Sequence, residues 1–269
     1  MYCRKCAGAC VCLGKGGRRQ VWPVLRRREK VNDWEELTRE KEIITVIGAG
    51  GKSTCIRYLA EKYKSAGKRV LVTTTTHMRM PQTGACLGGT AEEILQTLED
   101  TGYAAAGIPV KEGGADKIKG LPGDVLARGI DAADVTLIEG DGSRGLPVKV
   151  PASHEPVIVP QTTRILLVAG LSCLGEELGK VCHRRELAGR ILNCRPDHRL
   201  SPEDLAVLLR EGYLFPLRER GKGIPVTVVL NQGDTRERRE KAERCRQSIK
   251  DAPVVITSLS KGKTYDSAF

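Results

Sequence analysis

Residues 43–54 read Ile43-Ile44-Thr45-Val46-Ile47-Gly48-Ala49-Gly50-Gly51-Lys52-Ser53-Thr54. A β-branched apolar run ends in a glycine turn, and a lysine, a serine and an amphipathic segment follow. This is the strand–loop–helix order of phosphate-binding loops. Glycines let backbone N–H groups approach an anion, the lysine adds a cation, and a serine hydroxyl is a suitable Mg²⁺ ligand. The stretch predicts a site for nucleotide phosphates and Mg²⁺, made of Gly48, Gly50, Gly51, Lys52, Ser53 and Thr54.

The loop is shorter than the usual phosphate loop, which has a glycine five positions before its Gly-Lys pair. Val46 stands at that position, so the loop has the form Gly48-x-x-Gly51-Lys52-Ser53. Short loops of this shape occur in Mur-type ligases. The alternative interpretation is a glycine-rich turn between a strand and a helix that binds no ligand.

The composition favours an aliphatic core. The chain has 269 residues, of which 40% are hydrophobic and 4% aromatic. This length suits one large α/β domain or two small ones, and aliphatic side chains suit buried parallel strands. The sequence contains no run of about eighteen apolar residues, so it predicts no membrane-spanning helix. The basic N-terminal region lacks the apolar core of a secretory signal.

The positive charge is concentrated at the N-terminus. The net charge is +11, yet residues 1–30 contain nine Lys and Arg and one Glu, so the rest is nearly balanced. The charge therefore gives no support for nucleic-acid binding by the core. We expect residues 1–41 to be a disordered basic extension with one helix around Val31–Lys41, and residues 42–269 to form the domain.

Cysteines divide into two groups. Four lie close together in the extension, at Cys3, Cys6, Cys10 and Cys12, and six are scattered. Scattered cysteines without a secretory signal indicate free thiols in a reducing cytoplasm. Cys3 and Cys6 have the spacing of a metal chelate, so the group of four is a candidate zinc or iron–sulfur ligand set. A non-native or over-extended start of the reading frame is the alternative.

From Glu42 onward, apolar strands alternate with amphipathic helices. This order predicts an α/β fold like that of P-loop NTPases, with a mostly parallel sheet and helices on both faces. A stretch rich in proline and glycine, residues 140–163, is expected to be a long functional loop. The predicted strands are 43–47, 69–73, 103–107, 135–139, 164–169, 225–230 and 254–257, and the predicted helices are 52–65, 91–100, 124–130, 185–192, 202 onward and 235–249.

Polar residues follow several of these strands, at the edge of the sheet where ligands of parallel sheets bind. Glu139 and Asp141 come directly after the strand at 135–139. Carboxylates at a strand end opposite a phosphate loop hold Mg²⁺. We therefore predict Lys52, Glu139 and Asp141 as catalytic residues. Ser53 and Asp141 are the predicted Mg²⁺ ligands, and Glu139 either assists or orients an attacking water.

Other polar segments extend the candidate site. Thr73–Thr76 supplies hydroxyls at a strand end, of which Thr75 is the candidate contact to Mg²⁺ or phosphate. Asn231-Gln232-Gly233-Asp234 is similar to the Asn-Lys-x-Asp element that selects guanine, so Asn231 and Asp234 are candidate base contacts. Gln232 replaces the lysine that packs on the base. Arg144 and Lys149 are cations for phosphate or an acidic substrate, and His154-Glu155-Pro156 is a candidate substrate or metal site.

Taken together, the motifs resemble the YqeC family, whose members are described as accessory proteins of selenium-dependent molybdenum hydroxylases. The resemblance covers about Glu42 to Thr257. The chain departs from the family pattern at Gly140, where alanine is usual, and at Gln232, where lysine is commoner. The motifs that carry the resemblance are residues 46–54, Val70–His77, Glu139–Ser143, Leu146–Lys149, His154–Ile158, His183-Arg184 and Val229–Asp234.

The resemblance implies a nucleotide-binding protein that assists the maturation of selenium-dependent molybdenum hydroxylases, with such a hydroxylase or its cofactor machinery as partner. From the residues we expect binding of Mg²⁺ with ATP or GTP, slow hydrolysis and a cytoplasmic location. Three alternatives remain: a Mur-ligase-like or kinase-type phosphoryl-transfer enzyme, a metallochaperone GTPase, and a P-loop scaffold without turnover.

Overall fold

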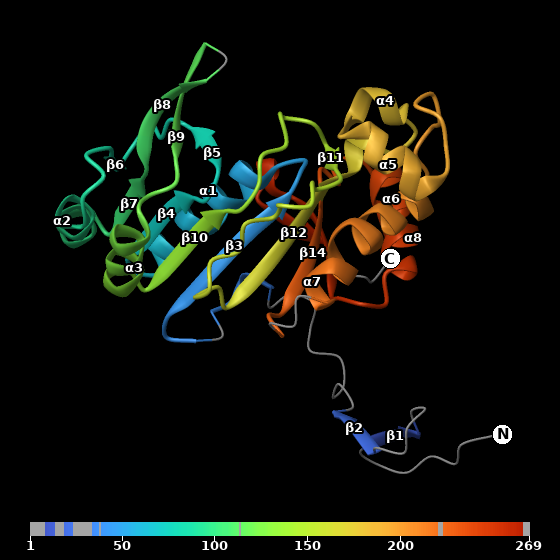
Figure 1. The fold of residues 1–269 in the computed structure, drawn as a ribbon, viewed down its shortest axis with the longest axis horizontal. Helices are drawn as coiled ribbons and strands as arrows, with labels where there is room; N and C mark the ends of the chain where they lie inside the picture. Colours follow the sequence, from blue (N-terminus) through green and yellow to red (C-terminus); the bar gives the residue numbers. More distant parts are fainter. Residues whose placement is uncertain are drawn as a thin grey trace.

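The computed structural model describes residues 9–13, 19–23, 34–37, 39–112, 114–219 and 223–265. Figure 1 shows the order of the elements along the chain. The strands are β1 (Ala9–Leu13), β2 (Arg19–Pro23), β3 (Glu42–Gly48), β4 (Val70–Thr74), β5 (His77–Arg79), β6 (Ala85–Cys86), β7 (Tyr103–Ala106), β8 (Ile108–Glu112), β9 (Ala115–Lys119), β10 (Val135–Glu139), β11 (Val148–Lys149), β12 (Arg164–Gly170), β13 (Cys182–His183), β14 (Val226–Asn231), β15 (Val254–Ser258) and β16 (Lys263–Tyr265). The helices are α1 (Lys52–Ser65), α2 (Ala91–Thr101), α3 (Gly123–Ala132), α4 (Leu178–Val181), α5 (Arg185–Leu192), α6 (Pro202–Leu209), α7 (Phe215–Glu219) and α8 (Arg236–Ser248).

Nine strands form one sheet in the order β16-β15-β14-β12-β3-β10-β4-β7-β6. All neighbours are parallel except β15 and β16. The strand that leads into the glycine turn, β3, lies near the middle of the sheet. It pairs with β10 on one side and β12 on the other. This arrangement brings the ends of β3 and β10 side by side.

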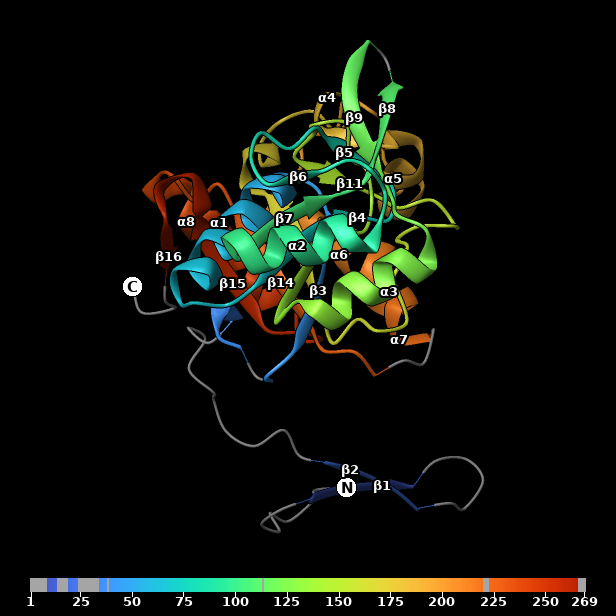
Figure 2. The ribbon, with the colours of Figure 1, turned by 90° about the vertical axis from the view of Figure 1, so that its left-hand side faces the viewer.

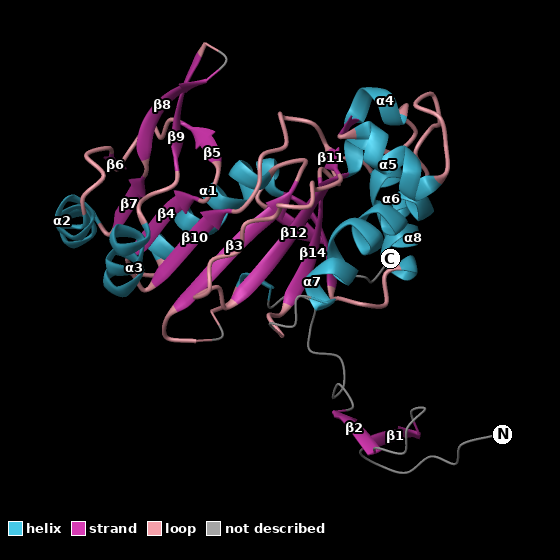
Figure 3. Ribbon diagram, in the orientation of Figure 1, coloured by secondary structure: helices cyan, strands magenta, loops and turns pink. Residues whose placement is uncertain are grey.

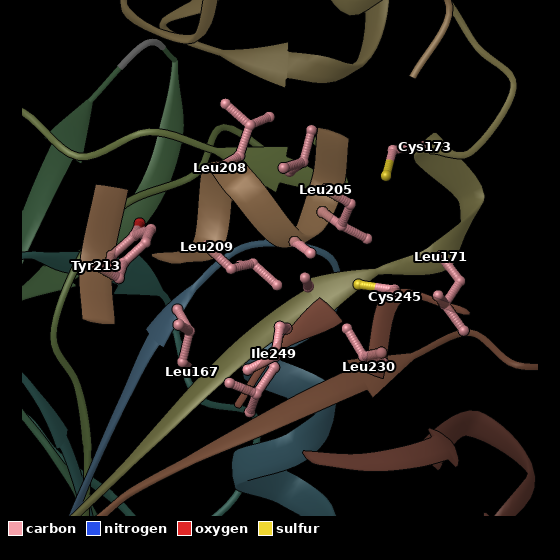
Figure 4. Close-up of a cluster of buried hydrophobic side chains, with 14 of the residues drawn as sticks. Leu167, Leu171, Cys173, Leu205, Leu208, Leu209, Tyr213, Leu230, Cys245 and Ile249 are labelled. Carbon is pink, nitrogen blue, oxygen red and sulfur yellow. The ribbon is translucent and has the colours of Figure 1, made fainter. Parts of the chain in front are cut away.

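The central strands are buried over their whole length because helices cover both faces of the sheet. Every residue of β3, β4, β10 and β12 is buried. One face packs Val46, Leu137 and Val168 against α1, and the other packs Leu167 and Leu230 against α6 and α8. Figure 4 shows the hydrophobic cluster on the face covered by α6 and α8, with Tyr213 at its margin. Continuous aliphatic burial of this kind is what parallel strands require.

The direction of each crossover explains which face each helix covers. The connection from β3 through α1 to β4 runs toward the β6 edge, whereas the connections through α2, α3, α6 and α8 run toward the β16 edge. Right-handed crossovers that run in opposite directions place their helices on opposite faces. Accordingly α1 covers one face, and α2 and α3 pack side by side on the other (Figure 2). The predicted α/β fold, with a mostly parallel sheet between helices, is confirmed.

The predicted order of the main strands and helices agrees with the structure, and α1 and α5 have the predicted bounds. The sequence did not predict the three-stranded antiparallel sheet β5-β9-β8, which projects from the main sheet (Figure 1). Its strands are short and carry charged residues, so their alternation is weak. The long loop after β10 is largely irregular, as expected, apart from β11 (Figure 3).

The expected helix around Val31–Lys41 is wrong where the structure describes it. Residues 34–35 form one 3-10 turn, and residues 36–37 and 39–41 are bends or irregular. Trp34 is 5% exposed and stacks on Tyr58 of α1, while Glu35 accepts hydrogen bonds from Tyr58 and Lys62. Tertiary packing of Trp34 therefore fixes this segment, which a helical propensity alone cannot show.

Two of the four N-terminal cysteines, Cys3 and Cys6, lie outside the described residues. Cys10 and Cys12 belong to β1, which pairs with β2 in a sheet of its own, and the structure describes the backbone there. Among the described residues, no helix is long and apolar enough to cross a membrane.

Candidate functional site

The glycine turn between β3 and α1 is held in a conformation that only glycine adopts easily. Gly48, Gly50 and Gly51 have φ values of +92°, +75° and +127°. The turn is also packed from two sides. A Cβ atom at Gly50 would lie 2.2 Å from the backbone nitrogen of Gly170, and one at Gly51 would lie 2.3 Å from Nδ2 of Asn231. Both backbone conformation and space therefore require glycine here.

Three amides of the turn already have acceptors within the protein. The Gly48 N–H donates to both carboxylate oxygens of Asp141, at 3.1 and 3.2 Å. The Ala49 N–H donates to the Val168 carbonyl, at 2.9 Å, and the Gly50 N–H to the Leu146 carbonyl, at 3.1 Å. These bonds shape the turn. The expectation that the Gly48 and Gly50 amides face an anion is thus revised, because neighbouring strands and loops supply their acceptors.

The N–H groups that remain for an anion lie at the start of α1. The helix begins after Gly51 with no side-chain cap and no acidic residue in its first turn. The first four N–H groups of a helix have no partner within the helix, and they carry the positive end of its dipole. Ser53 is exposed and Thr54 half-buried at this end. The predicted phosphate contacts therefore narrow to Gly51, Lys52, Ser53 and Thr54.

Lys52 folds back over the turn. Its ammonium donates to the Gly48 carbonyl at 2.8 Å and lies 3.4 Å from Asp141 and 3.8 Å from Glu139. The side chain is 3% exposed, so two carboxylates compensate a buried charge. The structure thus brings the three predicted catalytic residues, Lys52, Glu139 and Asp141, together.

The two carboxylates differ in their surroundings. Glu139 lies with its Oε2 3.3 Å from the hydroxyl of Ser53, the other predicted Mg²⁺ ligand. Burial raises the pKa of Glu139; the charge of Lys52 lowers it and that of Asp141 raises it further. Asp141 is fully buried and is bonded to Gly48, as described above, and not to Ser53. Glu139 is therefore the carboxylate beside Ser53, in place of Asp141, which the sequence favoured.

Asp141 begins a buried chain of charges that leads away from the turn. Its Oδ2 accepts a hydrogen bond from the Tyr213 hydroxyl at 2.9 Å and lies 3.3 Å from the Lys149 ammonium. Lys149, fully buried, lies 2.8 Å from Glu155, which in turn lies 2.5 Å from Arg184. The loop after β10 and the start of α5 are thereby joined to the phosphate loop.

The buried chain of charges sets the protonation states of Glu155 and Tyr213. Although burial raises the pKa of Glu155, hydrogen bonds from Arg184 and Lys149 lower it to about 2. Burial, together with the negative charge of Asp141, raises the pKa of the Tyr213 hydroxyl well above its usual range. Glu155 is therefore an anion and Tyr213 a neutral donor near neutral pH.

The remaining candidate residues are engaged by the protein itself. Asn231 donates from Nδ2 to the Gly50 carbonyl at 3.0 Å and accepts from the Leu259 N–H at 3.1 Å, so it braces the turn. Asp234 accepts from the Ser258 hydroxyl and lies 3.6 Å from Arg238. The Thr75 hydroxyl donates to the Val157 carbonyl at 3.1 Å.

The matched motifs correspond to a known family. The family model described as "YqeC protein" matches residues 44–186, which is more than half of the chain. The chain belongs to the YqeC family. The match runs from β3 to the start of α5, so it includes Lys52, Glu139 and Asp141 and the charged chain that ends at Arg184. Tyr213 and Asn231 lie beyond it.

A curated relative supports this membership. The "Uncharacterized protein YqeC" of Escherichia coli (strain K12) is 32% identical over 177 residues, which cover 62% of this chain and 67% of that protein.

Two solved structures give weak structural matches. They are the signal recognition particle 54 kDa protein of Aeropyrum pernix K1 in complex with GDP, with a TM-score of 0.42 and 15% identity, and FtsY of Mycoplasma mycoides, with 0.31 and 11%. Each match covers 87% of this chain, which spans 45% and 57% of those chains. The assignment of the fold rests on the strand order and the phosphate loop of this chain.

Two cavities of the described part of the chain are lined by residues outside the glycine turn. One cavity of about 350 Å³ is lined by Glu155, Arg190 and Glu211 among others. Another, of about 400 Å³, includes His154 and lies near the start of β12 and β14. Within the described residues, no group of three or more His, Cys, Asp or Glu side chains forms a metal site.

Sequence reasoning missed two features of the site. It did not connect Lys149, Glu155 and Arg184, because a contact between residues so far apart in the chain leaves no local pattern. It also missed Tyr213, which lies in a π-helical turn at Arg210–Leu214. The apolar periodicity of α6 ends just before this turn, and nothing in the spacing marks Tyr213 as polar-facing. Such π-turns are frequent at functional sites.

Proposed function

We propose that this protein binds a nucleoside triphosphate with Mg²⁺ and hydrolyses it slowly. The observation that carries the proposal is the uncapped first turn of α1, which stands beside Lys52, Ser53 and Glu139. An uncapped helix start together with a buried lysine is a ready-made site for phosphate oxygens.

Lys52 is the residue that responds to phosphate. Its present partners are the Gly48 carbonyl and two carboxylates. Phosphate oxygens at the start of α1 offer Lys52 an anionic partner of the same kind. The lysine then turns from Asp141 to the phosphate, and Asp141 keeps the bonds from Gly48, Tyr213 and Lys149.

The donor set beside the turn fits a magnesium ion. Mg²⁺ keeps several waters and takes one or two protein oxygens together with substrate phosphates. Ser53 and Glu139 are the residues that would hold it, and the ion would neutralise charge on the phosphates. Asp141 contributes indirectly, because it orients the turn through the Gly48 N–H.

The choice between ATP and GTP depends on residues near the end of β14. Asp234 is the candidate contact to the base. It accepts a hydrogen bond from the Ser258 hydroxyl, so a base would compete with Ser258 for this carboxylate. Gln232 has a φ of +68° and accepts from the Ser172 N–H, so its side chain turns away from a stacking role. A weak preference between the two nucleotides is expected.

The broader role that we propose is assistance in maturing selenium-dependent molybdenum hydroxylases in the cytoplasm, with the hydroxylase or its cofactor machinery as partner. This proposal rests on the family. A strain that lacks the protein should contain the hydroxylase polypeptide in normal amount with a reduced selenium content. Normal selenium content would contradict this role.

A phosphoryl-transfer enzyme is the second candidate. It is favoured by the cationic side chains next to the phosphate loop, which suit an acidic second substrate. Release of free phosphate from ATP or GTP supports the first function, whereas a phosphorylated acid as product supports the second.

Binding is tested by titrating ATP and GTP, each with and without Mg²⁺, into the full chain in a calorimeter. Lys52→Ala should weaken binding at least about tenfold, because a charge-assisted contact is lost. Lys64→Ala is the matched control, since Lys64 lies on the same helix at its far, exposed end. Ser53→Ala should weaken binding only when Mg²⁺ is present. A Lys52→Ala protein that binds with unchanged affinity would refute the phosphate site.

A further inference from the structure

Four basic side chains come together beside the phosphate loop: Arg144, Lys149, His183 and Arg184. Lys149 and His183 are direct partners in the pairing of β11 with β13, and Arg184 follows His183. Arg144 lies in the turn that leads to Leu146. Because the Leu146 carbonyl accepts from the Gly50 N–H at 3.1 Å, this turn rests against the phosphate loop.

The backbone holds two of these residues in an unusual conformation. Arg144 and Arg184 have φ values of +53° and +63°. Residues with side chains adopt such values rarely, and the left-handed conformation costs free energy for an arginine. Strained residues of this kind persist where the surrounding structure over-determines them, and they cluster at ligand sites.

The charges in this cluster are unequally compensated. Lys149 is paired with Asp141 and Glu155, and Arg184 is paired with Glu155. Arg144 is exposed, and none of the described carboxylates lies within 4.0 Å of it. Positive charge is therefore in excess at the end of the cluster that faces the phosphate loop.

Among the described residues, the buried Nδ1 of His183 has no hydrogen-bond partner. Burial lowers the pKa of His183, and the charges of Arg184, Lys149 and Arg144 lower it further. A half-buried imidazole in a positive field, with a buried ring nitrogen that has no partner, is stabilised by an anion that accepts its N–H.

We propose that Arg144 and His183 bind an oxyanion, the carboxylate or phosphate of a second substrate, beside the phosphate loop. The oxyanion accepts a forked pair of hydrogen bonds from the Arg144 guanidinium. It accepts a further bond from the ring N–H of His183, while Lys149 and Arg184 supply positive potential from behind. The inference rests on the proposed function only for the role of the ligand as a second substrate. The site itself stands without it.

The experiment is a calorimetric titration of orthophosphate, and separately succinate, which binds Mg²⁺ only weakly, into the full chain saturated with Mg²⁺ and ADP; the Lys52→Ala protein identifies any orthophosphate that binds at the phosphate loop. Arg144→Gln and His183→Leu should each weaken binding of at least one probe by about tenfold or more, as expected for a lost charged hydrogen bond. Arg236→Gln is the control, since Arg236 is an exposed arginine of α8 paired with Glu240. The affinity for ADP should stay unchanged in all three.

Two results would overturn the proposal: the wild-type chain binds neither probe, or the Arg144→Gln and His183→Leu proteins bind both as tightly as the control. Arg144 is exposed, so its replacement is not expected to disturb folding. Lys52→Ala separates this inference from the nucleotide site. It should retain orthophosphate binding that Arg144→Gln removes, even if no nucleotide binds to the chain.

Discussion

Replacing Gly50 by alanine tests the packing of the phosphate loop, and Gly67 provides a matched control. Gly50 and Gly67 have φ values of +75° and +74°. An alanine in this conformation costs about 1–2 kcal/mol at either position. The surroundings differ. At Gly50 a Cβ atom would lie 2.2 Å from the Gly170 nitrogen and 2.6 Å from the Pro147 carbonyl oxygen, whereas nothing lies within 4 Å at Gly67.

The added cost at Gly50 comes from backbone that must move. Overpacking typically costs a further 1–3 kcal/mol, so we expect a total loss of roughly 2–5 kcal/mol for Gly50→Ala and about 1–2 kcal/mol for Gly67→Ala. Urea unfolding followed by circular dichroism measures both losses, and the difference between them isolates the packing. Equal losses would show that the turn tolerates a side chain, and would refute the close approach of β12 and the Leu146–Pro147 segment to this loop.

Three further predictions concern the buried polar groups. Lys149→Met should destabilise the protein by about 3–5 kcal/mol in urea unfolding, since it leaves Asp141 and Glu155 without a shared cation; a loss below about 1 kcal/mol would argue against the chain of charges. The lowered pKa of Glu155 contributes stability that is present above the ordinary carboxyl pKa and is lost as pH falls toward about 2. Glu155→Gln should therefore flatten the decline in melting temperature between pH 5 and pH 2. Parallel declines in the two proteins would contradict this. Asn231→Ala removes the bond to the Gly50 carbonyl and should cost about 1–3 kcal/mol by calorimetry, and an unchanged melting temperature would contradict a bracing role.

The sequence predicts the core of the fold because local patterns carry it. Strands such as β3 and β10 are apolar runs bounded by glycine or charge, and α1 combines a glycine start with an apolar face. The antiparallel strands β5, β8, β9 and β16 escape prediction because their pairing depends on partners elsewhere in the chain. Their residues are partly exposed, so no continuous apolar run marks them.

The sequence predicts Lys52, Glu139 and Asp141 as members of the candidate site, but it predicts neither Tyr213 nor the contacts that set the role of each residue. Strand ends place Lys52, Glu139 and Asp141 near one another, since parallel strands end at one edge of the sheet. Spacing does not show that Tyr213, 72 positions away, donates to Asp141, or that Asn231 bonds to the turn. These contacts arise from the arrangement of α6, the π-turn and β14 on the sheet, which local sequence does not encode.

The different surroundings of Asp141 and Glu139 suit these carboxylates to different roles. Asp141 accepts from the Gly48 N–H with both oxygens, Lys52 lies beside its Oδ1, and Tyr213 and Lys149 lie beside its Oδ2. A metal ion at Asp141 would have to displace several of these groups and leave them buried without acceptors, which is costly. Glu139 has Lys52 on one oxygen and the exposed Ser53 hydroxyl on the other. If the protein binds phosphate and Mg²⁺ as proposed, Glu139 would hold the metal ion once Lys52 contacts phosphate, and Asp141 would keep its contacts to the turn.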